Sequence, residues 1–266
     1  MKQTIEADNL QPSSRPGALT IDLSGKNVLV TGGSRGIGRA IAICLAGCGA
    51  NVAIVYRRAD RESSEVVQTI ESMGCKALSI KCDAAVHEEA AAAVAQVITC
   101  FGSLDILVNN VAISNNVPFL SITPEVWNRA VSVNVNSLYN FSWPALHHMM
   151  EKRYGRILNV GSICGVRPIA AVPVHYAATK GAMHAFTFTL AKEMARYNIL
   201  INSIAPGLVE TNFAMGLPEP RLRDFEKFCP MKRVGSPEEI ANLAAFMVSD
   251  LNTYMTGETV VVGGGL

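Results

Sequence analysis

Short apolar runs alternate with longer segments of helical periodicity along most of the chain, beginning at Asn27. The runs are apolar throughout instead of alternating with polar residues, which is typical of strands buried on both faces of a sheet. Strands and helices that alternate in this way are typical of parallel sheets covered by helices on both sides. The sequence therefore predicts an α/β fold with a doubly wound parallel sheet of about seven strands. The predicted strands are residues 28–30, 52–55, 77–80, 104–108, 156–160, 200–204 and 260–262.

The segments between these strands carry start and stop signals of helices. Pro124 and Pro237 stand at first-turn positions, and Gly74 stands where the end of a helix favours glycine. Ser236 and Glu239 form the sequence pattern of a capping box. The predicted helices are residues 39–48, 61–73 and 88–101, a helical region from 124 through 152, and residues 177–196 and 237–249.

Length and composition limit the classes of protein to consider. The 266 residues suit one domain, which we place at residues 25–266 after an N-terminal arm, residues 1–24. With 49% hydrophobic and 17% charged residues, the chain must bury much apolar surface, inside itself or against copies of itself. The arm has no apolar core of a signal peptide, and no apolar run approaches the ~18 residues that span a bilayer. A net charge of +1 argues against a nucleic-acid-binding protein of the basic-patch type.

The cysteines and histidines suggest neither disulfides nor a metal site. The seven cysteines form no C-x-x-C pair, and this odd number without framework spacing predicts free thiols in a reducing cytoplasm. Cys164, two residues after Ser162, is either an accessible thiol or a small packing residue. The histidines have no metal-ligand spacing with the cysteines, so we expect no bound metal.

A glycine-rich turn follows the first strand and opens the first helix, which is the context that a dinucleotide site requires. Gly32 suits a tight turn, Gly36 lets the backbone approach a pyrophosphate, and Gly38 permits close packing of helix and strand. The unpaired N–H groups at the start of the helix attract the anion. Although the spacing differs from G-x-G-x-x-G and such a turn can be purely structural, its position favours nucleotide binding.

The end of the second strand indicates which nicotinamide cofactor binds. About twenty residues after the turn, where an acidic residue would hold the ribose hydroxyls of NAD, the chain has Tyr56-Arg57-Arg58. Arg35 in the glycine turn adds a third cation. Guanidinium groups suit a 2′-phosphate, so the pattern favours NADP(H) over NAD(H). The alternative is that both strand-end arginines are simply solvated.

The candidate chemistry centres on Tyr176 and Lys180, which are four residues apart and therefore share one helix face. An ordinary tyrosine has a pKa of about 10 and is a poor acid–base group at neutral pH. A neighbouring ammonium group lowers that pKa, and a serine hydroxyl such as that of Ser162 can hold a carbonyl oxygen against the phenol. On its own, the same spacing also arises from a core tyrosine beside a solvated lysine.

Taken together, these motifs resemble the short-chain dehydrogenase/reductase family over about residues 25–266. Residues 31–38 look like its cofactor loop, and residues 109–112 are similar to its N-N-A-G segment. Asp83 resembles the acidic residue that meets the adenine, and residues 206–211 look like the loop beside the nicotinamide. The residues that match the family's catalytic tetrad are Asn134, Ser162, Tyr176 and Lys180. The resemblance implies a single Rossmann-type domain that transfers a hydride from a bound cofactor.

The resemblance also implies a role for each residue of the tetrad. Tyr176 is the general acid in reduction, Ser162 orients the carbonyl, and Lys180 lowers the pKa of Tyr176 and binds the nicotinamide ribose. Asn134 holds a water that links Lys180 to solvent. The implied cofactor-binding residues are Gly32, Ser34, Arg35, Gly36, Ile37, Gly38, Arg57, Arg58, Asp83, Asn110, Tyr176, Lys180, Pro206, Gly207, Val209 and Thr211. Simpler roles stay open for two residues: Asn134 can satisfy the backbone of its own helix, and Asp83 can be an N-cap.

Within the family, residues 230–241 and the Tyr-Arg strand end look closest to 3-oxoacyl-[acyl-carrier-protein] reductases and related ketoreductases. The leading hypothesis is therefore an NADPH-dependent carbonyl reductase of a 3-oxoacyl compound or similar ketone. One alternative is an NAD(P)-dependent alcohol dehydrogenase of a sugar, steroid or small polyol. Another is a catalytically idle nucleotide-binding subunit, against which the intact tetrad argues.

Departures from the family pattern leave the substrate open. Val111-Ala112 replaces Ala-Gly, and the interval from Ser162 to Tyr176 is one residue longer than is commonest in the family. Gly263 stands where Asp is frequent, and the N-terminal arm is extra. The first two departures change the substrate pocket.

The resemblance implies two kinds of macromolecular contact. Arg153 matches a basic position that those reductases use for an acidic carrier protein, and the second such position falls near Arg196-Tyr197. A solvated face is the equal alternative. A homodimer or homotetramer is also implied, built from the helical region 134–152 and the Tyr176 helix.

Residues 208–230 follow Pro206-Gly207 and combine apolar and basic side chains. Gly216, Pro218 and Pro220 exclude one regular helix through the whole segment. We expect a lid that is open or disordered without ligand and closes over the substrate. The alternative is a long surface connection.

Overall fold

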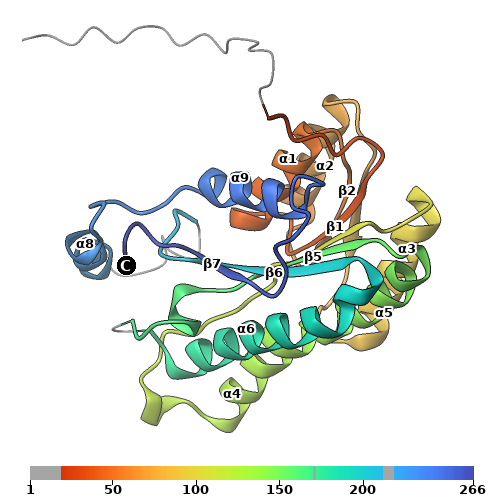
Figure 1. Cartoon of the computed structure of the whole chain (residues 1–266). Coiled ribbons are helices and arrows are strands. Elements are labelled where there is room, and N and C mark those ends of the chain that lie inside the picture. Colours follow the sequence, from red (N-terminus) through yellow and green to blue (C-terminus); the bar gives the residue numbers. More distant parts are fainter. Residues whose placement is uncertain (1–18, 170–171, 212–218) are drawn as a thin grey trace, which may run out of the picture.

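The computed structural model of the chain describes residues 19–169, 172–211 and 219–266. Seven strands form one sheet in the order β3-β2-β1-β4-β5-β6-β7, and every neighbouring pair is parallel (Figure 1). The strands are β1 (Asn27–Thr31), β2 (Asn51–Tyr56), β3 (Ala77–Lys81), β4 (Ile106–Asn109), β5 (Gly155–Val160), β6 (Ile199–Pro206) and β7 (Thr259–Val262). The order reverses between β1 and β4, and ligands of such sheets bind beyond the strand ends at this switch point.

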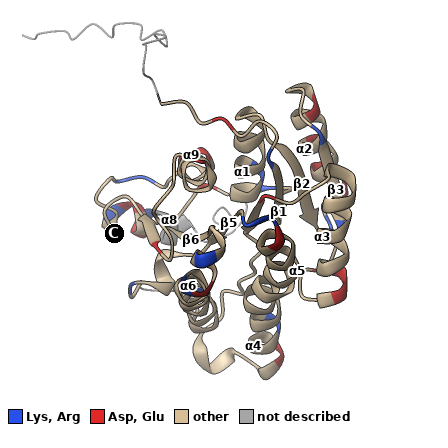
Figure 2. Cartoon of the chain, turned by 45° about the vertical axis from the view of Figure 1, so that its right-hand side comes forward, with Lys and Arg blue, Asp and Glu red and all other residues tan. Residues whose placement is uncertain are grey.

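Helices cover both faces of the sheet (Figure 1). One face packs against α1 (Gly36–Gly47), α2 (Asp60–Ser72) and α9 (Pro237–Val248). The other packs against α3 (His87–Phe101), α5 (Ser137–Lys152) and α6 (Val174–Met194). Strands β1, β2, β4, β6 and β7 contain no charged residue, and charged positions lie mainly on helices and loops (Figure 2). Both sheet faces are therefore apolar, which explains the apolar strands and the predicted α/β fold.

A helical region runs without a break from α4 (Pro124–Val131) into α5. Between them, Ser132–Asn136 form a π-helical turn, a feature that is frequent at functional sites. This turn carries Asn134, whose side chain is completely buried. The predicted region from 124 to 152 is thus correct, but the π-helical turn inside it was not predicted.

The predicted helices need small corrections at their starts. Helix α1 begins at Gly36, three residues earlier than expected, because the glycine turn itself forms the first helical turn. Helix α6 begins at Val174, so Tyr176 lies inside its first turn. The capping box of Ser236 and Glu239 is present at the start of α9.

Leu23, near the end of the predicted arm, packs against the domain. The side chain of Leu23 is buried, and its N–H donates a hydrogen bond of 2.7 Å to the carbonyl of Cys48. The rest of the predicted arm, residues 1–18, lies outside the described residues. Within the described part of the chain, no helix is long and apolar enough to cross a bilayer. All seven cysteines are free thiols.

Among its described residues, the segment predicted to be a lid contains the helix α8 (Glu219–Phe228). Residues 208–211 are not helical, in agreement with the expectation that no single helix spans the segment. Residues 212–218, including Phe213, Met215 and Leu217, lie outside the described residues. The role of this segment as a lid stays a prediction.

Candidate active site

A cleft of about 670 Å³ opens where the carboxyl ends of the strands meet α6. Each of β1, β2, β3, β4 and β5 contributes the residues at which it ends or the loop that follows it. The predicted residues that line this cleft are Gly32, Ser34, Arg35, Gly36, Ile37, Arg57, Arg58, Asp83, Asn110, Tyr176, Lys180 and Thr211. The sheet thus brings together residues that are far apart in the sequence.

The glycine turn forms one wall of the cleft. Gly32 and Gly36 have φ of +65° and +55°, a conformation that favours glycine. A Cβ atom on Gly38 would lie 2.3 Å from the carbonyl oxygen of Gly32, so only glycine allows α1 to pack this closely on the turn. A Cβ atom on Gly36 would lie 3.2 Å from Cγ2 of Thr211, on the opposite side of the cleft.

Asn110 joins the ends of the two central strands at the switch point. Its backbone N–H donates to Oγ1 of Thr31 at 2.9 Å, and its side-chain amide donates to the carbonyls of Thr31 at 3.0 Å and Gly32 at 3.2 Å. The loop after β4 and the glycine turn after β1 therefore hold each other in place.

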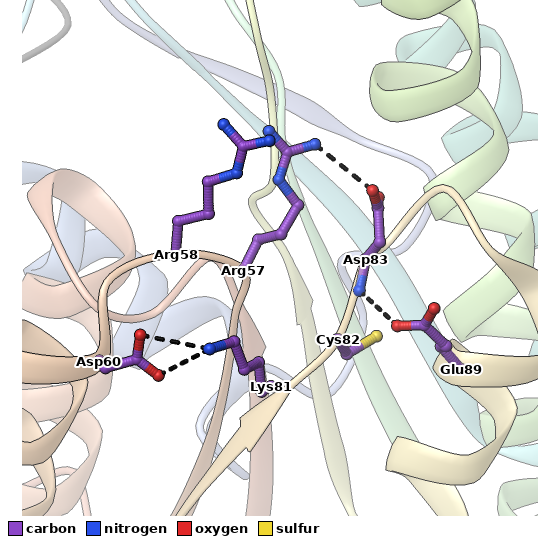
Figure 3. Close-up of a pocket in the computed structure, with 7 residues that line it drawn as sticks. All are labelled: Arg57, Arg58, Asp60, Lys81, Cys82, Asp83 and Glu89. Atoms are coloured by element: carbon purple, nitrogen blue, oxygen red, sulfur yellow. Dashed lines mark hydrogen bonds and ion pairs between the residues drawn. The ribbon is translucent and has the colours of Figure 1, made fainter.

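Basic side chains gather at the end of the cleft formed by β2 and β3 (Figure 3). Arg57 and Arg58 both line this end, and Arg57 pairs with Asp83 at 3.4 Å. Among the described residues, neither Arg35 nor Arg58 has an ion-pair or hydrogen-bond partner for its side chain. Two cations at this end of the cleft are thus available for an anion.

Asp83 interacts with groups that the sequence did not reveal. Its carboxylate pairs with Arg129 of α4 at 3.3 Å as well as with Arg57, and it accepts a hydrogen bond of 3.1 Å from the N–H of Ala85. Partial burial acts to raise the pKa of Asp83, but this hydrogen bond and the two arginines outweigh it and lower the pKa. The N-cap of α3 is Val86, so the alternative role of Asp83 as a helix cap is wrong.

Tyr176, Lys180 and Ser162 meet at the other end of the cleft. The ammonium group of Lys180 lies 5.7 Å from the ring centroid of Tyr176 and donates a hydrogen bond of 2.8 Å to the carbonyl of Val160. Ser162, in the loop after β5, hydrogen-bonds the phenol of Tyr176. The thiol of Cys164 lies 3.1 Å from Oγ of Ser162, so it is part of this cluster and is half-buried.

Burial dominates the ionisation of this pair. It raises the pKa of Tyr176 well above its ordinary value, an effect that the hydrogen bond from Ser162 only partly offsets. It lowers the pKa of Lys180 to about 8. The expectation that Lys180 brings the pKa of Tyr176 down is therefore wrong for the protein without ligands, because desolvation of the phenolate is the larger effect.

Asn134 connects three elements next to Lys180. Its side-chain oxygen accepts from the N–H of Ile113 at 2.8 Å, and its amide donates to the carbonyl of Ile113 at 2.9 Å and to Thr179 at 3.0 Å. Its side chain therefore does not hydrogen-bond the backbone of its own helix, and the simpler alternative is wrong. Both side-chain N–H groups are engaged, so the expected water would have to donate to an oxygen of Asn134.

Some predicted residues lie beside the cleft without lining it: Gly38, Asn134, Ser162, Pro206, Gly207 and Val209. The side chain of Val209 is buried in the apolar core, and its backbone bridges to Gly235. The N–H of Gly207 is bonded to the carbonyl of Val262 at 2.8 Å. Lining residues that were not predicted are Val55, Tyr56, Ala59, Glu62, Cys82, Ala84, Val111, Ala112, Ile113, Val133, Val160 and Gly161. Most are apolar and fill strand ends, so only the topology reveals them.

Comparison with known proteins identifies the family. The family model described as enoyl-(acyl carrier protein) reductase matches residues 32–266. The 3-oxoacyl-[acyl-carrier-protein] reductase FabG of Aquifex aeolicus is 36% identical over 93% of this chain and 100% of its own length. That of Staphylococcus epidermidis is 34% identical over 91% of this chain and 98% of its own. The chain belongs to the short-chain dehydrogenase/reductase family.

Solved structures of the family share the fold. A short-chain dehydrogenase from Burkholderia cenocepacia, in complex with NADP, superposes with a TM-score of 0.85 at 34% identity, covering 91% of this chain and 98% of that one. A short-chain type dehydrogenase/reductase from Mycobacterium marinum has a TM-score of 0.87 at 32% identity and covers 92% and 96%. The chain is thus an oxidoreductase of this family that acts on CH–OH or C=O groups.

The cleft of this short-chain dehydrogenase/reductase fits a nicotinamide dinucleotide. The glycines of the turn leave room for a pyrophosphate at the start of α1, where no side chain caps the first N–H groups. The unpaired Arg35 and Arg58 lie at one end and Tyr176 with Lys180 at the other. When bound, the nicotinamide supplies or accepts the hydride.

The lowered pKa of Lys180 predicts how stability changes with pH. Between about pH 8 and its ordinary value of 10.5, the unfolded chain holds a proton on Lys180 that the folded chain has lost. The free energy of unfolding therefore rises with pH across this window, by about 3 kcal/mol in total for this group. Urea unfolding of the wild type and Lys180→Met from pH 7 to 10.5 should show this rise in the difference between the two proteins. A constant difference would show that Lys180 has an ordinary pKa, and a falling one that its pKa is raised; either would contradict this prediction.

Proposed function

We propose that the protein is an NADPH-dependent carbonyl reductase that converts a 3-oxoacyl compound or a similar ketone to the hydroxy compound. The observation that carries this proposal is the meeting of Tyr176, Ser162 and Lys180 at one end of a cleft whose other end holds unpaired arginines. This arrangement places a proton donor and a dinucleotide site in one continuous space.

The state of the phenol suits reduction. Because burial raises the pKa of Tyr176, the phenol keeps its proton over the whole physiological range and can donate it to the oxygen of a reduced ketone. The tyrosinate that remains is stabilised by the ammonium group of Lys180 and by the hydroxyl of Ser162. Lys180 stays mostly charged at neutral pH, since its pKa is about 8.

The charges in the cleft support NADP(H) over NAD(H). Among the described lining residues, Arg35, Arg57 and Arg58 are basic near the strand end of β2, whereas Glu62 and Asp83 are acidic. The charge of Asp83 is taken up by Arg57 and Arg129, so a net positive field remains for a 2′-phosphate. The NADP complex of the Burkholderia relative agrees with this proposal.

Relatives named for acyl carrier protein substrates support an acyl ketone as substrate. Arg153, at the end of α5, donates a hydrogen bond of 3.1 Å to the carbonyl of Arg196, so the two basic positions are neighbours at the surface. They lie just before β5 and β6, at the edge of the sheet opposite to the cleft. A carrier docked there lies away from the cleft of its own chain, so we propose that it serves the cleft of a second copy.

Exposed apolar side chains on α5 and α6 support such a copy. Tyr139 and Trp143 are 52% and 46% exposed, and Phe188 on α6 is 52% exposed. We propose that these helices pair with their equivalents across a two-fold axis, in a dimer or in the dimers of a tetramer.

Replacing Tyr176 tests the reductase itself. Tyr176→Phe removes the proton donor and keeps the ring, so turnover should fall by roughly 10²–10⁴-fold while NADPH still binds. The assay follows NADPH absorbance with a panel of 3-oxoacyl thioesters, simple ketones, sugars and steroids. Near-full activity of Tyr176→Phe would show that Tyr176 is not the proton donor. A wild type that acts only on sugar or steroid alcohols would favour the alternative dehydrogenase.

Cofactor preference tests the basic end of the cleft. Arg58→Ala should lower the ratio of kcat/KM for NADPH to that for NADH by about tenfold, because a charge-assisted contact contributes about 1.5–3 kcal/mol. Arg61→Ala is the matched control, since Arg61 pairs with Glu65 on the outside of α2 and should leave the ratio unchanged. Equal kcat/KM for both cofactors in the unmodified protein would refute the preference.

Sedimentation tests the assembly. At micromolar concentration we expect a dimer or tetramer, and Trp143→Asp should shift it toward smaller species by placing a charge in the apolar contact. Met73→Asp, at the end of α2 on the other face of the sheet, is the control for an added surface charge. A stable monomer of the unmodified protein would contradict the proposed pairing.

A further inference from the structure

The catalytic face of α6 continues one turn beyond Lys180. Tyr176, Lys180 and His184 are spaced by four residues, so they lie in one row along the helix. The side chain of His184 is 6% exposed, and the proton transfer described above makes no use of it. Buried histidines are uncommon unless both ring nitrogens have partners, so its contacts show what it does.

His184 contacts the loop that carries Ser162. Its Nε2 atom lies 3.1 Å from the carbonyl oxygen of Ser162. On the other side of the ring, Nδ1 lies 3.1 Å from Oγ of Ser203 in β6 and 3.2 Å from Oγ1 of Thr259 in β7. One imidazole thus connects α6 with the loop after β5, with β6 and with the start of β7.

These contacts determine the form of the ring. A carbonyl oxygen only accepts hydrogen bonds, so Nε2 must carry a proton and donate it to Ser162. Nδ1 then accepts from the hydroxyl of Ser203 or Thr259 in the neutral ring. Burial lowers the pKa of His184, which keeps this neutral form at physiological pH.

The exit of β5 is held at three consecutive residues. The carbonyl of Val160 accepts from Lys180, the N–H of Gly161 donates to Ile204 at 2.7 Å, and the carbonyl of Ser162 accepts from His184. A Cβ atom on Gly161 would lie 2.3 Å from Cε1 of His184, so the ring occupies the space that any other residue at 161 would need.

We propose that His184 is a positioning residue of the active site: it fixes the main chain of Ser162 and thereby aims the Ser162 hydroxyl at Tyr176 and the substrate oxygen. This inference rests on the proposed carbonyl reduction and adds to it a residue outside the tetrad. A displacement of about 1 Å at a reacting group can lower a rate by about a hundredfold. Loss of the hydrogen bond from His184 to Ser162 should therefore lower kcat.

Three substitutions separate the contacts of the ring. His184→Gln keeps a donor at the place of Nε2 and should retain most of kcat. His184→Asn is too short to reach Ser162 but keeps an amide near Ser203 and Thr259, and should lower kcat by about 10- to 100-fold. His184→Leu removes both contacts and should lower kcat at least as much as Asn does. The dissociation constant for NADPH should change less than twofold in all three, because position 184 does not itself line the cleft.

A matched control removes a different buried contact of the same helix. Thr187 accepts a hydrogen bond of 2.9 Å from Asn159, which lies inside β5 and three residues before Ser162. Thr187→Val should lower the melting temperature and leave kcat within twofold of the wild type. If His184→Asn and His184→Leu also change only the melting temperature, His184 is merely structural and the proposal is wrong.

A double-mutant cycle asks whether His184 acts through Ser162. In a Ser162→Ala background, adding His184→Asn should lower kcat less than twofold further, because the hydroxyl that His184 aims is already gone. If kcat of the double variant falls by the product of the two single-variant factors, the residues act independently and the proposal is wrong.

A readout without any substrate separates this inference from the proposed function. Cys164 is next to Ser162, so its alkylation by iodoacetamide, followed by peptide mass and referred to the exposed Cys100, reports the position of the loop. The rate at Cys164 should rise severalfold in His184→Asn and His184→Leu but not in Thr187→Val. An unchanged rate would overturn the role of His184, whereas a wild type that reduces no ketone would refute the proposed function and leave this test intact.

Discussion

The site depends on a lysine whose ammonium group lies inside the protein. Lys180 is 2% exposed, and burial of a charge is costly unless polar groups replace the lost water. The carbonyl of Val160 provides one such group, and the cleft gives the rest of the ammonium group access to a ligand. Burial lowers the pKa of Lys180 and raises the pKa of Tyr176. The shift of Tyr176 favours a phenol that enters the reaction protonated. With a pKa of about 8, Lys180 is still mostly charged at neutral pH and can stabilise the product tyrosinate.

The sheet makes this arrangement possible because it places every strand end at one edge. The loops after β1 and β4 hold each other through Asn110 and Thr31, and α6 holds the loop after β5 through Lys180 and His184. Asn134 ties the π-helical turn to the loop after β4 and to Thr179. Lys180, the main chain of Ser162 and Asn134 are therefore each held by a contact with another element, which is what precise positioning requires.

Much of this could be predicted from the sequence, because the relevant signals are local. Apolar strands, the glycine turn and the Tyr176–Lys180 spacing each depend on residues a few positions apart, and the predicted sheet and helices are correct apart from their ends and α8. Contacts between distant segments could not be predicted in the same way. Arg129 gives no local sign that it will meet Asp83, and His184 looks like an ordinary helix residue until β6 and β7 are placed beside it. The sign of the pKa shift of Tyr176 was also missed, because it depends on burial, which the pattern around one helix does not give.

The most direct test of carbonyl reduction is to follow the hydride into the product. The protein is incubated with a 3-oxoacyl thioester and NADPH that carries deuterium at the transferable position of the nicotinamide, and the product is analysed by mass spectrometry. We expect the product of the wild type to carry one deuterium on the new carbinol carbon. Over the same time, Tyr176→Phe should form almost none of this labelled product. Product without deuterium, or an intact ketone in the presence of bound NADPH, would contradict the reductase assignment.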